Sequence, residues 1–545
     1  MKKIDRRQFL KYGTAGAAAI VVGSKVSAPW LGGSQAYAAT QTLNFTLTDA
    51  IKQMHTHIPR NTATCYFWVF KDMIARPNFP TGFPAEVPGP QVYATAGDTI
   101  QITLNNDRNA SGETLGFAIA RGGGVVEFDS KNQGLPNGVA PGASATFSFQ
   151  VPGPGTYLYY AFRNSLGPGD PVPRLMGLHG ALVSMPAGSV APFGWSKYPY
   201  SDAALASAPG VKQLYDDFGE APWWPGLAWH EGDPNPGGPN PTPPYRQYIW
   251  LTHQASPNLF AAVGNNATIS FTNQEGVAKS GRARDTAIFI EAFVNDRFIA
   301  TSNDGRANTA KLDRFNFKPH FFTINGQSGH FCHNNAAITP MHRVGECTLV
   351  RIINAGLWTH SMHIHANHVY VTAVDNEVQE NPLWVDVFFL HPMGHMDYTL
   401  PFMRPPDVPN VGGIGRGGSG QAALATLAAP PFPGFPGAVS HPAWPPVEEF
   451  TLHHPKIGTI KKGFLGGTVD IAQRQSPLCF PMHSHTEPDQ TTQGGNYNTA
   501  LISGMYFIGD QNGPLKDFPI DEDFQMMLDM GGSTSATNPA AGKAP

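Results

Sequence analysis

Hydrophobic and polar positions alternate in short runs along most of the chain from about residue 41 onward. TLNFTLTDA (42–50) and TIQITLNN (99–106) place apolar side chains at nearly every second position, and YIWLTHQA (248–255) restarts the strands further along the chain. A period of two is the spacing of a strand that buries one face against a core. No convincing amphipathic helix appears in the first half of the chain, so the pattern predicts an all-β protein.

Turn residues separate these runs. Gly97-Asp98 divides VYAT from TIQITL, which predicts a hairpin within residues 87–106. Residues 135–160 repeat the scheme of strand, Pro-Gly turn and strand, and GLHGALVSMP (177–186) closes the unit. We therefore expect an antiparallel β-sandwich of ordinary domain size, about 150 residues.

Two Pro/Gly-rich stretches interrupt the strands and divide the chain. YIWLTHQA can pair with FFTINGQ (321–327) inside one sandwich, which makes the residues between them an insertion. We favour two sandwiches, with three as the alternative. The expected segments are a signal peptide (1–38), an N-terminal domain (41–190), a Pro/Gly/Trp-rich linker (191–247), a C-terminal domain (248–515) with insertions at 257–310 and 405–447, and a disordered tail (531–545).

Composition agrees with a chain of short strands and many turns. The 545 residues include 59 glycines and 50 prolines, and only 14% are charged, against about 25% in typical soluble domains. The net charge is −4, without a basic run, which argues against nucleic acid as a partner. The four cysteines could form one or two disulfides, and their pairing stays open.

The N-terminus indicates export. Arg6 and Arg7 precede Phe9, Leu10 and a weakly apolar run, and Ala36-Tyr37-Ala38 offers a small-x-small cleavage site. This pattern is typical of a twin-arginine signal. The run is too short and too rich in glycine for a good spanning helix. We expect a periplasmic or secreted product with no transmembrane segment in the mature chain.

Six histidines on two short segments are the candidate metal ligands. HSMHIHANH begins at His360, and CFPMHSHTEP begins at Cys479. Residues i and i+2 of a strand share a face, so His363 points the same way as His365, and His483 the same way as His485. Two such pairs on facing strands could surround one metal, and neutral imidazole suits copper and zinc alike.

Several motifs together resemble the multicopper oxidase family of cupredoxin-fold proteins. VPGPQVYATAGDTIQITLNN resembles the family's opening signature, and GVAPGASATFSFQVPGPGTYLYY resembles its next block. FFTINGQ, VRIINAG and HSMHIHANHVYV are similar to the start of its last domain, and CFPMHSHTEP through GMYFIG to its final block. The resemblance implies tandem Greek-key sandwiches and copper as cofactor. It also implies His363, His365, His483, His485 and His360 as metal ligands.

The chain departs from the family pattern at several ligand positions. Ser484 stands where the family has the cysteine of its blue copper site, and a hydroxyl cannot supply a soft thiolate. Tyr160-Ala161-Phe162 replaces a first-domain His-x-His pair, and Asp489 replaces a further histidine. His55 and His57 could compensate, directly or from a neighbouring subunit, because two-domain relatives often form trimers.

Some other residues are expected to be structural. His179 lies on a strand that we expect to be buried, and Met505 is expected in the core. His368 resembles a position that the family often keeps without using it as a ligand. His391, His395 and the pair His453-His454 have no matching role in the family pattern. The Met-rich FQMMLDM (524–530) is expected to be a short apolar anchoring helix.

Three functions remain open on this basis. The favoured one is a copper-binding oxidoreductase that oxidises a phenol or metal ion with oxygen at a histidine-only site. The alternatives are a copper-binding protein without turnover and a copper-free envelope scaffold. The sequence does not assign catalytic residues, and a homotrimer is one expected assembly.

Overall fold

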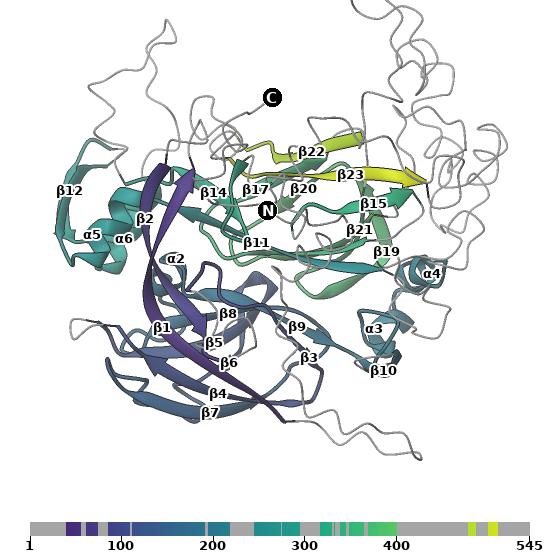
Figure 1. The fold of residues 1–545 in the computed structure, drawn as a ribbon, viewed down its shortest axis with the longest axis horizontal. Coiled ribbons are helices and arrows are strands. Elements are labelled where there is room, and N and C mark those ends of the chain that lie inside the picture. Colours follow the sequence, from purple (N-terminus) through teal and green to yellow (C-terminus); the bar gives the residue numbers. More distant parts are fainter. Residues whose placement is uncertain are drawn as a thin grey trace, which may run out of the picture.

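The computed structural model shows a protein built almost entirely of β-sheets. In Figure 1 these sheets stack as layers from bottom to top. The structure describes residues 40–55, 62–74, 85–108, 112–190, 194–217, 245–273, 275–294, 317–329, 332, 338–344, 348–364, 369–400, 478–486 and 500–510. The N-terminal signal, the C-terminal tail, the 405–447 insertion and the Met-rich segment lie outside these residues.

The first sandwich pairs a four-stranded sheet with a five-stranded sheet. The outer sheet has the order β2-β1-β4-β7, and the inner sheet has the order β3-β9-β8-β5-β6. Phe45 of β1 stacks on Tyr159 of β8 with 5.8 Å between ring centroids, so aromatic side chains join the two sheets. The strands are β1 (Thr40–His55), β2 (Thr62–Asp72), β3 (Val92–Thr95), β4 (Thr99–Asn106), β5 (Leu115–Arg121), β6 (Val125–Asp129), β7 (Ser144–Gln150), β8 (Gly155–Arg163) and β9 (His179–Met185).

The second sandwich pairs a six-stranded sheet, β14-β11-β16-β21-β18-β19, with a five-stranded sheet, β15-β23-β22-β17-β20. Trp250, Ile352, Met362 and Met482 belong to the apolar core between them. The strands are β11 (Arg246–Ala255), β14 (Phe321–Ile324), β15 (Met341–Val344), β16 (Thr348–Asn354), β17 (His360–Ile364), β18 (Val369–Val374), β19 (Glu377–Val385), β20 (Val387–Leu390), β21 (His395–Leu400), β22 (Leu478–Ser484) and β23 (Ile502–Asp510).

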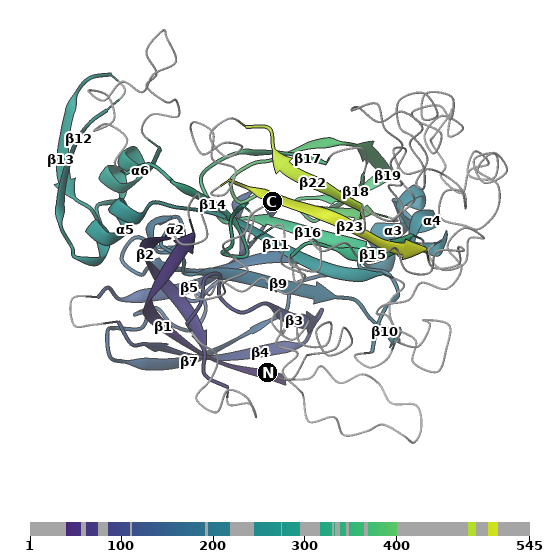
Figure 2. The same cartoon turned by 45° about the horizontal axis from the view of Figure 1, so that its top comes forward.

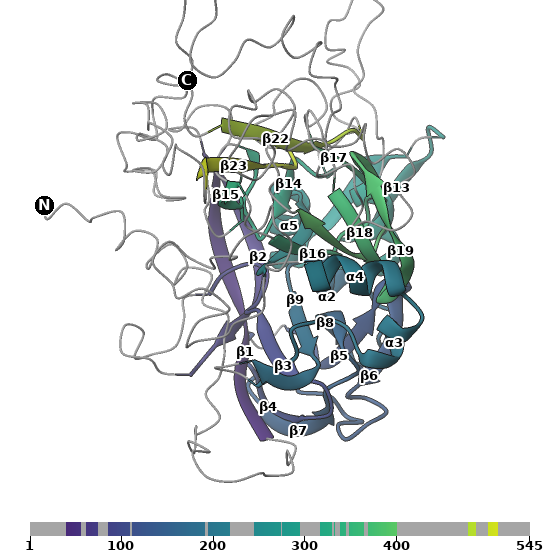
Figure 3. The same ribbon diagram turned by 90° about the vertical axis from the view of Figure 1, so that its right-hand side faces the viewer.

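The two sandwiches join through their inner sheets. Leu158 and Phe162 of β8 pack in one apolar cluster with Leu251 of β11 and Ile353 of β16. Every residue of β8 and of β16 is buried, since both strands are covered on both faces. The sheet that carries β17 and β22 is therefore the outermost layer, on the far side from the first sandwich (Figures 1 and 3).

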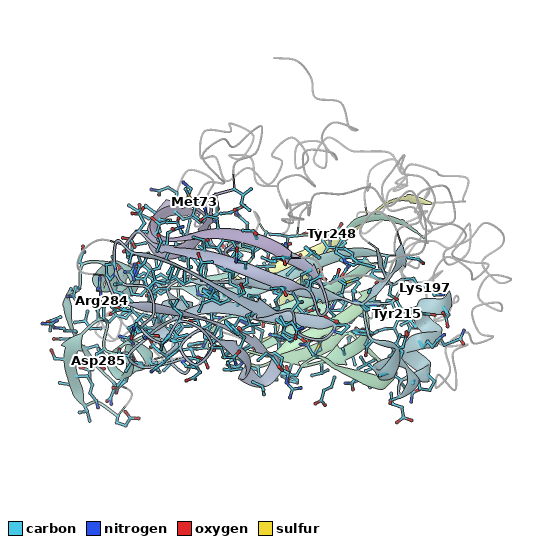
Figure 4. All side chains as sticks on the ribbon, turned by 90° about the horizontal axis from the view of Figure 1, so that it is seen from below. Met73, Lys197, Tyr215, Tyr248, Arg284 and Asp285 are labelled. Carbon is cyan, nitrogen blue, oxygen red and sulfur yellow. The ribbon has the colours of Figure 1, made fainter. Side chains whose placement is uncertain are left out.

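Helices cover the ends of this stack. The insertion after β11 holds two helices and a two-stranded hairpin, and it projects from one end of the molecule (Figure 2). Arg284 and Asp285 label this end in Figure 4, and Lys197 and Tyr215 label the opposite end, where α4 packs on β19. These elements are η1 (Gly122–Gly124), α2 (Val172–Leu175), β10 (Ala187–Val190), α3 (Asp202–Ala206), α4 (Pro209–Asp217), α5 (Pro257–Gly264), β12 (Thr268–Thr272), β13 (Ala278–Arg282) and α6 (Thr286–Val294).

The expected all-β class with tandem sandwiches is confirmed, and so is the pairing of YIWLTHQA with FFTINGQ, since Thr252 faces Ile324 in an antiparallel β11–β14 pair. The part of the chain that the structure describes contains no helix long and apolar enough to cross a membrane. Helices α3 and α4 in the linker and α5 and α6 in the insertion had not been expected. The domain boundaries drawn from the sequence stay predictions.

Two pairing expectations are wrong. β3 and β4 do not form a hairpin across Gly97-Asp98, because β3 pairs in parallel with β9 while β4 pairs with β1 and β7 in the opposite sheet. β7 and β8 are likewise divided between the two sheets. Nor are the sheets purely antiparallel, since β1–β4, β3–β9, β11–β16 and β15–β23 are parallel pairs. Alternation identifies a half-buried strand, but long-range contacts choose its neighbour.

Two of the four cysteines are free thiols. Cys65 and Cys332 are both buried and unpaired. Burial in an apolar environment raises the pKa of each thiol, which makes them inert core residues. The nearest pair in the sequence, Cys332 with Cys347, is therefore not a disulfide in this structure.

Candidate metal centre

The two histidine segments form adjacent strands. β17 and β22 pair antiparallel in the outermost sheet, with His363 directly opposite His483. Residues that face each other in such a pair project from the same side of the sheet. His485 follows the last residue of β22, and its backbone N–H donates to the Ser361 carbonyl at 2.6 Å.

Three imidazole rings meet on this face. The ring centroid of His363 lies 5.7 Å from that of His483 and 4.6 Å from that of His485. The centroids of His483 and His485 are 5.0 Å apart. Three imidazoles that bind one ion at about 2.0–2.1 Å through single nitrogens have centroids roughly 4.5–5.5 Å apart. The two separations that involve His485 fall in this range, and the separation of His363 and His483 is slightly longer.

Hydrogen bonds fix which nitrogen of two of these rings carries its proton. His363 Nδ1 lies 3.0 Å from the Asp386 carbonyl oxygen, and His483 Nδ1 lies 3.0 Å from the Ser484 carbonyl oxygen. A carbonyl can only accept, so each neutral ring has its proton on Nδ1 and its lone pair on Nε2. This is the arrangement in which metal-binding histidines are oriented by backbone carbonyls.

The rings are close together, but their donor atoms do not converge as they stand. Among the described residues, no group of three or more His, Cys, Asp or Glu side chains has the geometry to hold a metal ion. The planes of His483 and His485 are within 28° of each other, whereas ligands around one ion diverge from it. Centroid distances alone do not test donor direction, so the spacing is compatible with a site that ring rotation would complete. His365, the expected fourth ligand, lies outside the described residues.

The candidate centre lies on the solvent side of the outermost sheet. Met362, Ile364 and Met482 alternate with the histidines and are buried in the core beneath them. The His363 side chain is 19% exposed, and His485 is exposed. Phe389 of β20 pairs with Ser361, so it lies on the same outer face, where it is 69% exposed.

His360 lies on the opposite face of this sheet. It is three residues before His363 on β17, so it points inward, and it is fully buried. Its Nε2 is 3.0 Å from Gln254 Nε2. His360 is therefore not part of the outer group of rings, and its assignment as a metal ligand stays a prediction that would require a separate ion.

Ser484 is buried on the inner face beside His360. Its Oγ accepts hydrogen bonds from the backbone N–H of Ser361 at 3.1 Å and of Thr486 at 3.2 Å. The hydroxyl thus ties β17 to the segment that carries His485. Ser484 therefore has a structural role in holding the two histidine segments together.

Asp386 is a neighbour of the centre that sequence reasoning missed. It lies between β19 and β20, and besides its carbonyl contact its Oδ2 is 3.9 Å from His363 Nδ1. Asp386 is far from His363 in the sequence and lies at the junction of two strands, so no periodic pattern in the sequence links the two residues. Only the fold brings it to the histidine.

Three further histidines that the structure describes, His179, His253 and His391, do not join this group. His179 and His253 are buried against each other between the sandwiches, with ring centroids 4.4 Å apart. Burial lowers the pKa of His179 to about 3 and the pKa of His253 well below its usual value, so both are neutral. His391 is partly exposed beside Asp375, with 3.2 Å from Nε2 to Oδ2.

Of the remaining candidate residues, the structure describes His55 and Met505. His55 ends β1 in the outer sheet of the first sandwich. Met505 is buried in the second core, as expected. The positions outside the described residues are His57, His368, His453, His454 and Asp489.

Sequence comparisons identify one domain directly. A family model described as "Multicopper oxidase" matches residues 79–187, which include β3 to β9. Within the curated proteins, L-ascorbate oxidase from Cucurbita maxima is 29% identical over 133 residues, which is 24% of this chain and 22% of that protein. The chain thus matches about a fifth of the length of this curated relative. The matched model lies in the first sandwich, whereas the candidate histidines lie in the second.

Solved structures with a similar arrangement are distant. The blue copper oxidase from Nitrosomonas europaea aligns at a TM-score of 0.40 and 12% identity, covering 90% of this chain and 94% of that one. The copper nitrite reductase from Nitrosomonas europaea aligns at 0.40 and 12%, covering 88% and 100%. Similarity at this level does not show a shared function. The chain is thus similar to multicopper oxidases, and the similarity in sequence is to residues 79–187 for the family model.

Proposed function

We propose that this protein is a copper-binding oxidoreductase whose metal is held on the outer face of the second sandwich. The ligands are His363, His483 and His485, with His365 as the fourth. The observation that carries the proposal is the meeting of three imidazoles on one solvent-facing surface, with the Nδ1 protons of His363 and His483 directed to carbonyl oxygens. Imidazole nitrogens of this kind are good ligands for copper.

The residues of the chain bind and orient, and the copper supplies redox chemistry and a position for oxygen when bound. The Asp386 carbonyl holds the ring of His363, and the Ser484 carbonyl holds the ring of His483. The Asp386 carboxylate is half exposed, and its Oδ2 lies 3.9 Å from His363 Nδ1. A small phenol or a metal ion is the electron donor that we propose, because the centre faces solvent and needs no relay.

A copper-binding protein without turnover is the second candidate. Ser484 favours it, since the buried hydroxyl that replaces the thiolate already accepts two backbone hydrogen bonds and offers no relay for electrons. Storage or tolerance needs only the ligands, without an open coordination position. Oxygen consumption with a donor distinguishes the two candidates, because a storage site binds copper without consuming oxygen.

We also propose that copies of the chain associate through the histidine face, as a homotrimer. The body of the first sandwich packs on the six-stranded sheet, and the histidine sheet lies beyond that sheet. The outer face of the histidine sheet is turned away from the body of this sandwich, and we propose that a second copy covers it. Exposed Phe389 on this face is an apolar contact that such a copy would bury.

The cell envelope is the proposed location. The twin-arginine pattern at Arg6 and Arg7 supports export, with the apolar run and the Ala36-Tyr37-Ala38 site behind it. A copper site on the surface of an exported protein meets metal ions and phenols outside the cytoplasm. Fractionation of cells that express the tagged full chain tests the location.

Copper content per chain is the test of the site. The wild-type protein should bind at least one copper after loading, and the double variant His363→Ala/His483→Ala should bind none while keeping its circular dichroism spectrum. His391→Ala, a partly exposed histidine of the same sandwich, is the matched control and should keep wild-type copper. No copper in the loaded wild type, or full copper in the double variant, contradicts the proposal.

A further inference from the structure

The side chain of Gln254 is fixed in one orientation. The fully buried side chain of Gln254 reaches the inner face of the histidine sheet. Its Oε1 accepts a hydrogen bond from the backbone N–H of Leu357 at 2.9 Å. A Cβ at Gly356 would lie 1.9 Å from that same oxygen, so the glycine allows the amide to enter. Because the backbone N–H must meet an oxygen, the NH2 group lies on the other side of the terminal carboxamide.

That NH2 group points at His360. Gln254 Nε2 is 3.0 Å from His360 Nε2, and both side chains have no exposed surface. An amide nitrogen is a donor only, so the imidazole nitrogen that it meets must accept. The neutral His360 ring therefore carries its proton on Nδ1.

From this geometry we propose that Gln254 excludes copper from the inner face of the histidine sheet by fixing the tautomer of His360. The His360 Nε2 lone pair accepts a hydrogen bond from the amide of Gln254, and Nδ1 carries the ring proton. Neither nitrogen of His360 therefore offers a lone pair to a metal. Moving the ring proton to Nε2 would set two N–H donors against each other in a buried site and leave both without an acceptor there, which is unfavourable.

A second residue acts in the same direction. Ser484 is on the same inner face, and its hydroxyl oxygen already accepts from Ser361 and Thr486. The inner face thus offers an imidazole with both nitrogens committed and a hydroxyl with its lone pairs used. The outer face, three residues further along β17, has rings whose Nε2 atoms carry lone pairs. Gln254 is accordingly the residue that confines metal to the outer face.

Nitrogen NMR of the imidazole rings tests the tautomer without any metal. With histidine labelled by ¹⁵N and the His360 signals assigned from their loss in His360→Asn, the wild type should show a protonated Nδ1. Gln254→Glu keeps an oxygen for Leu357 and places a second oxygen at His360, so Nε2 should gain a proton. A protonated Nε2 in the wild type, or the same tautomer in both proteins, overturns the proposal.

Copper content tests the consequence, which rests on the proposed function. His360→Asn should retain the copper per chain of the wild type, whereas His363→Ala/His483→Ala should lose it. Loss of one copper in His360→Asn would overturn the role of Gln254 and leave the proposed oxidoreductase standing. If the loaded wild type binds no copper, the proposed function fails, and the NMR result still decides the tautomer of His360.

Discussion

Arg351 of β16 and Asp397 of β21 form an ion pair of 3.0 Å that is buried at the junction of the two sandwiches. Arg351 Nη1 also donates to Thr156 Oγ1 of the first sandwich at 3.0 Å, and Tyr200 of the linker donates to Asp397 at 3.0 Å. Burial raises the pKa of the Asp397 carboxyl, and the Arg351 guanidinium and the hydroxyls of Tyr200 and Thr156 partly offset that rise. With Arg351 charged, we infer that the carboxylate is ionised at neutral pH.

Asp397→Asn should strongly destabilise the protein. It leaves the Arg351 guanidinium buried without a counter-charge, and removal of one partner of such a pair costs about 3–5 kcal/mol. Urea unfolding followed by tryptophan fluorescence measures the loss. Asp216→Asn is the control, since Asp216 pairs with Lys197 and Lys212 near the surface, and each such exposed pair contributes less than about 1 kcal/mol. Equal costs for the two variants would show that the buried pair does not join the sandwiches.

Buried neutral histidines should make the fold sensitive to acid. Burial lowers the pKa of His179 to about 3 and of His395 to about 4, and lowers that of His253 further below 6.5. The unfolded chain takes up protons near pH 6.5 and the folded chain does not. Stability is therefore fully present above that pH and falls as the pH drops toward 4, by about 1.4 kcal/mol per pH unit for each histidine.

The slope of unfolding free energy against pH measures this effect between pH 6.5 and 5. His395→Leu should reduce the slope by about one proton, because it removes one group that titrates only when unfolded. His391→Leu is the control, since that ring is 49% exposed and partly solvated in the fold. A flat dependence in the wild type would mean that the buried rings are charged or hydrated.

The hydroxyl of Ser484 should matter for both stability and metal affinity. Ser484→Ala removes the acceptor for two backbone N–H groups next to His363 and His485, which should cost about 1–3 kcal/mol. Loss of a group that orients ligands typically weakens metal affinity about 10- to 100-fold. Competition with a chromogenic copper chelator gives the affinity, and thermal unfolding gives the stability.

Ser503→Ala is the matched control for this variant. Ser503 is another buried hydroxyl of the same sheet, and its side chain contacts Thr339, with 3.1 Å between the two oxygens, rather than the backbone beside a histidine. It should lose stability without a change in copper affinity. An unchanged affinity in Ser484→Ala would remove Ser484 from the support of the site.

The sequence predicted the strands and the shared face of each His-x-His pair because both follow from a local period of two. The sequence offered the meeting of the two histidine segments only as a possibility, and the β17–β22 pair that places His363 opposite His483 is a finding of the structure. It did not predict the partner sheets of β3 and β4, since pairing depends on contacts far along the chain. Gln254 and Asp386 were missed for the same reason: neither lies near the histidines in sequence, and only the fold brings them there.

The sequence also did not predict on which face of the β17–β22 sheet the candidate centre lies. Period two states that His360 and His363 point in opposite directions, but not which of them faces the core. The order of four sheet layers decides it, and that order arises from apolar contacts between the inner sheets, such as Leu158 against Ile353. His485 shows another limit, because it joins the group of rings from beyond the end of β22, where strand periodicity no longer applies.

Exposed Phe389 gives a direct test of assembly through the histidine face. If copies of the chain bury this side chain, it contributes about 1.5–3 kcal/mol to each interface. Phe389→Asp would replace that contribution with the cost of burying a carboxylate, so dissociation should become at least about 10-fold easier. Light scattering after size-exclusion chromatography should show the wild type as an oligomer and the variant as a monomer.

Leu166→Asp is the control for this test, since Leu166 is 56% exposed on the first sandwich, away from the histidine sheet. It should keep the wild-type mass. Copper content measured on the same fractions separates assembly from metal binding: a monomeric Phe389→Asp that keeps its copper shows that one chain supplies all the ligands. A monomeric variant that loses its copper shows that a second copy completes the site, and a wild type that is itself monomeric at micromolar concentration rejects the assembly.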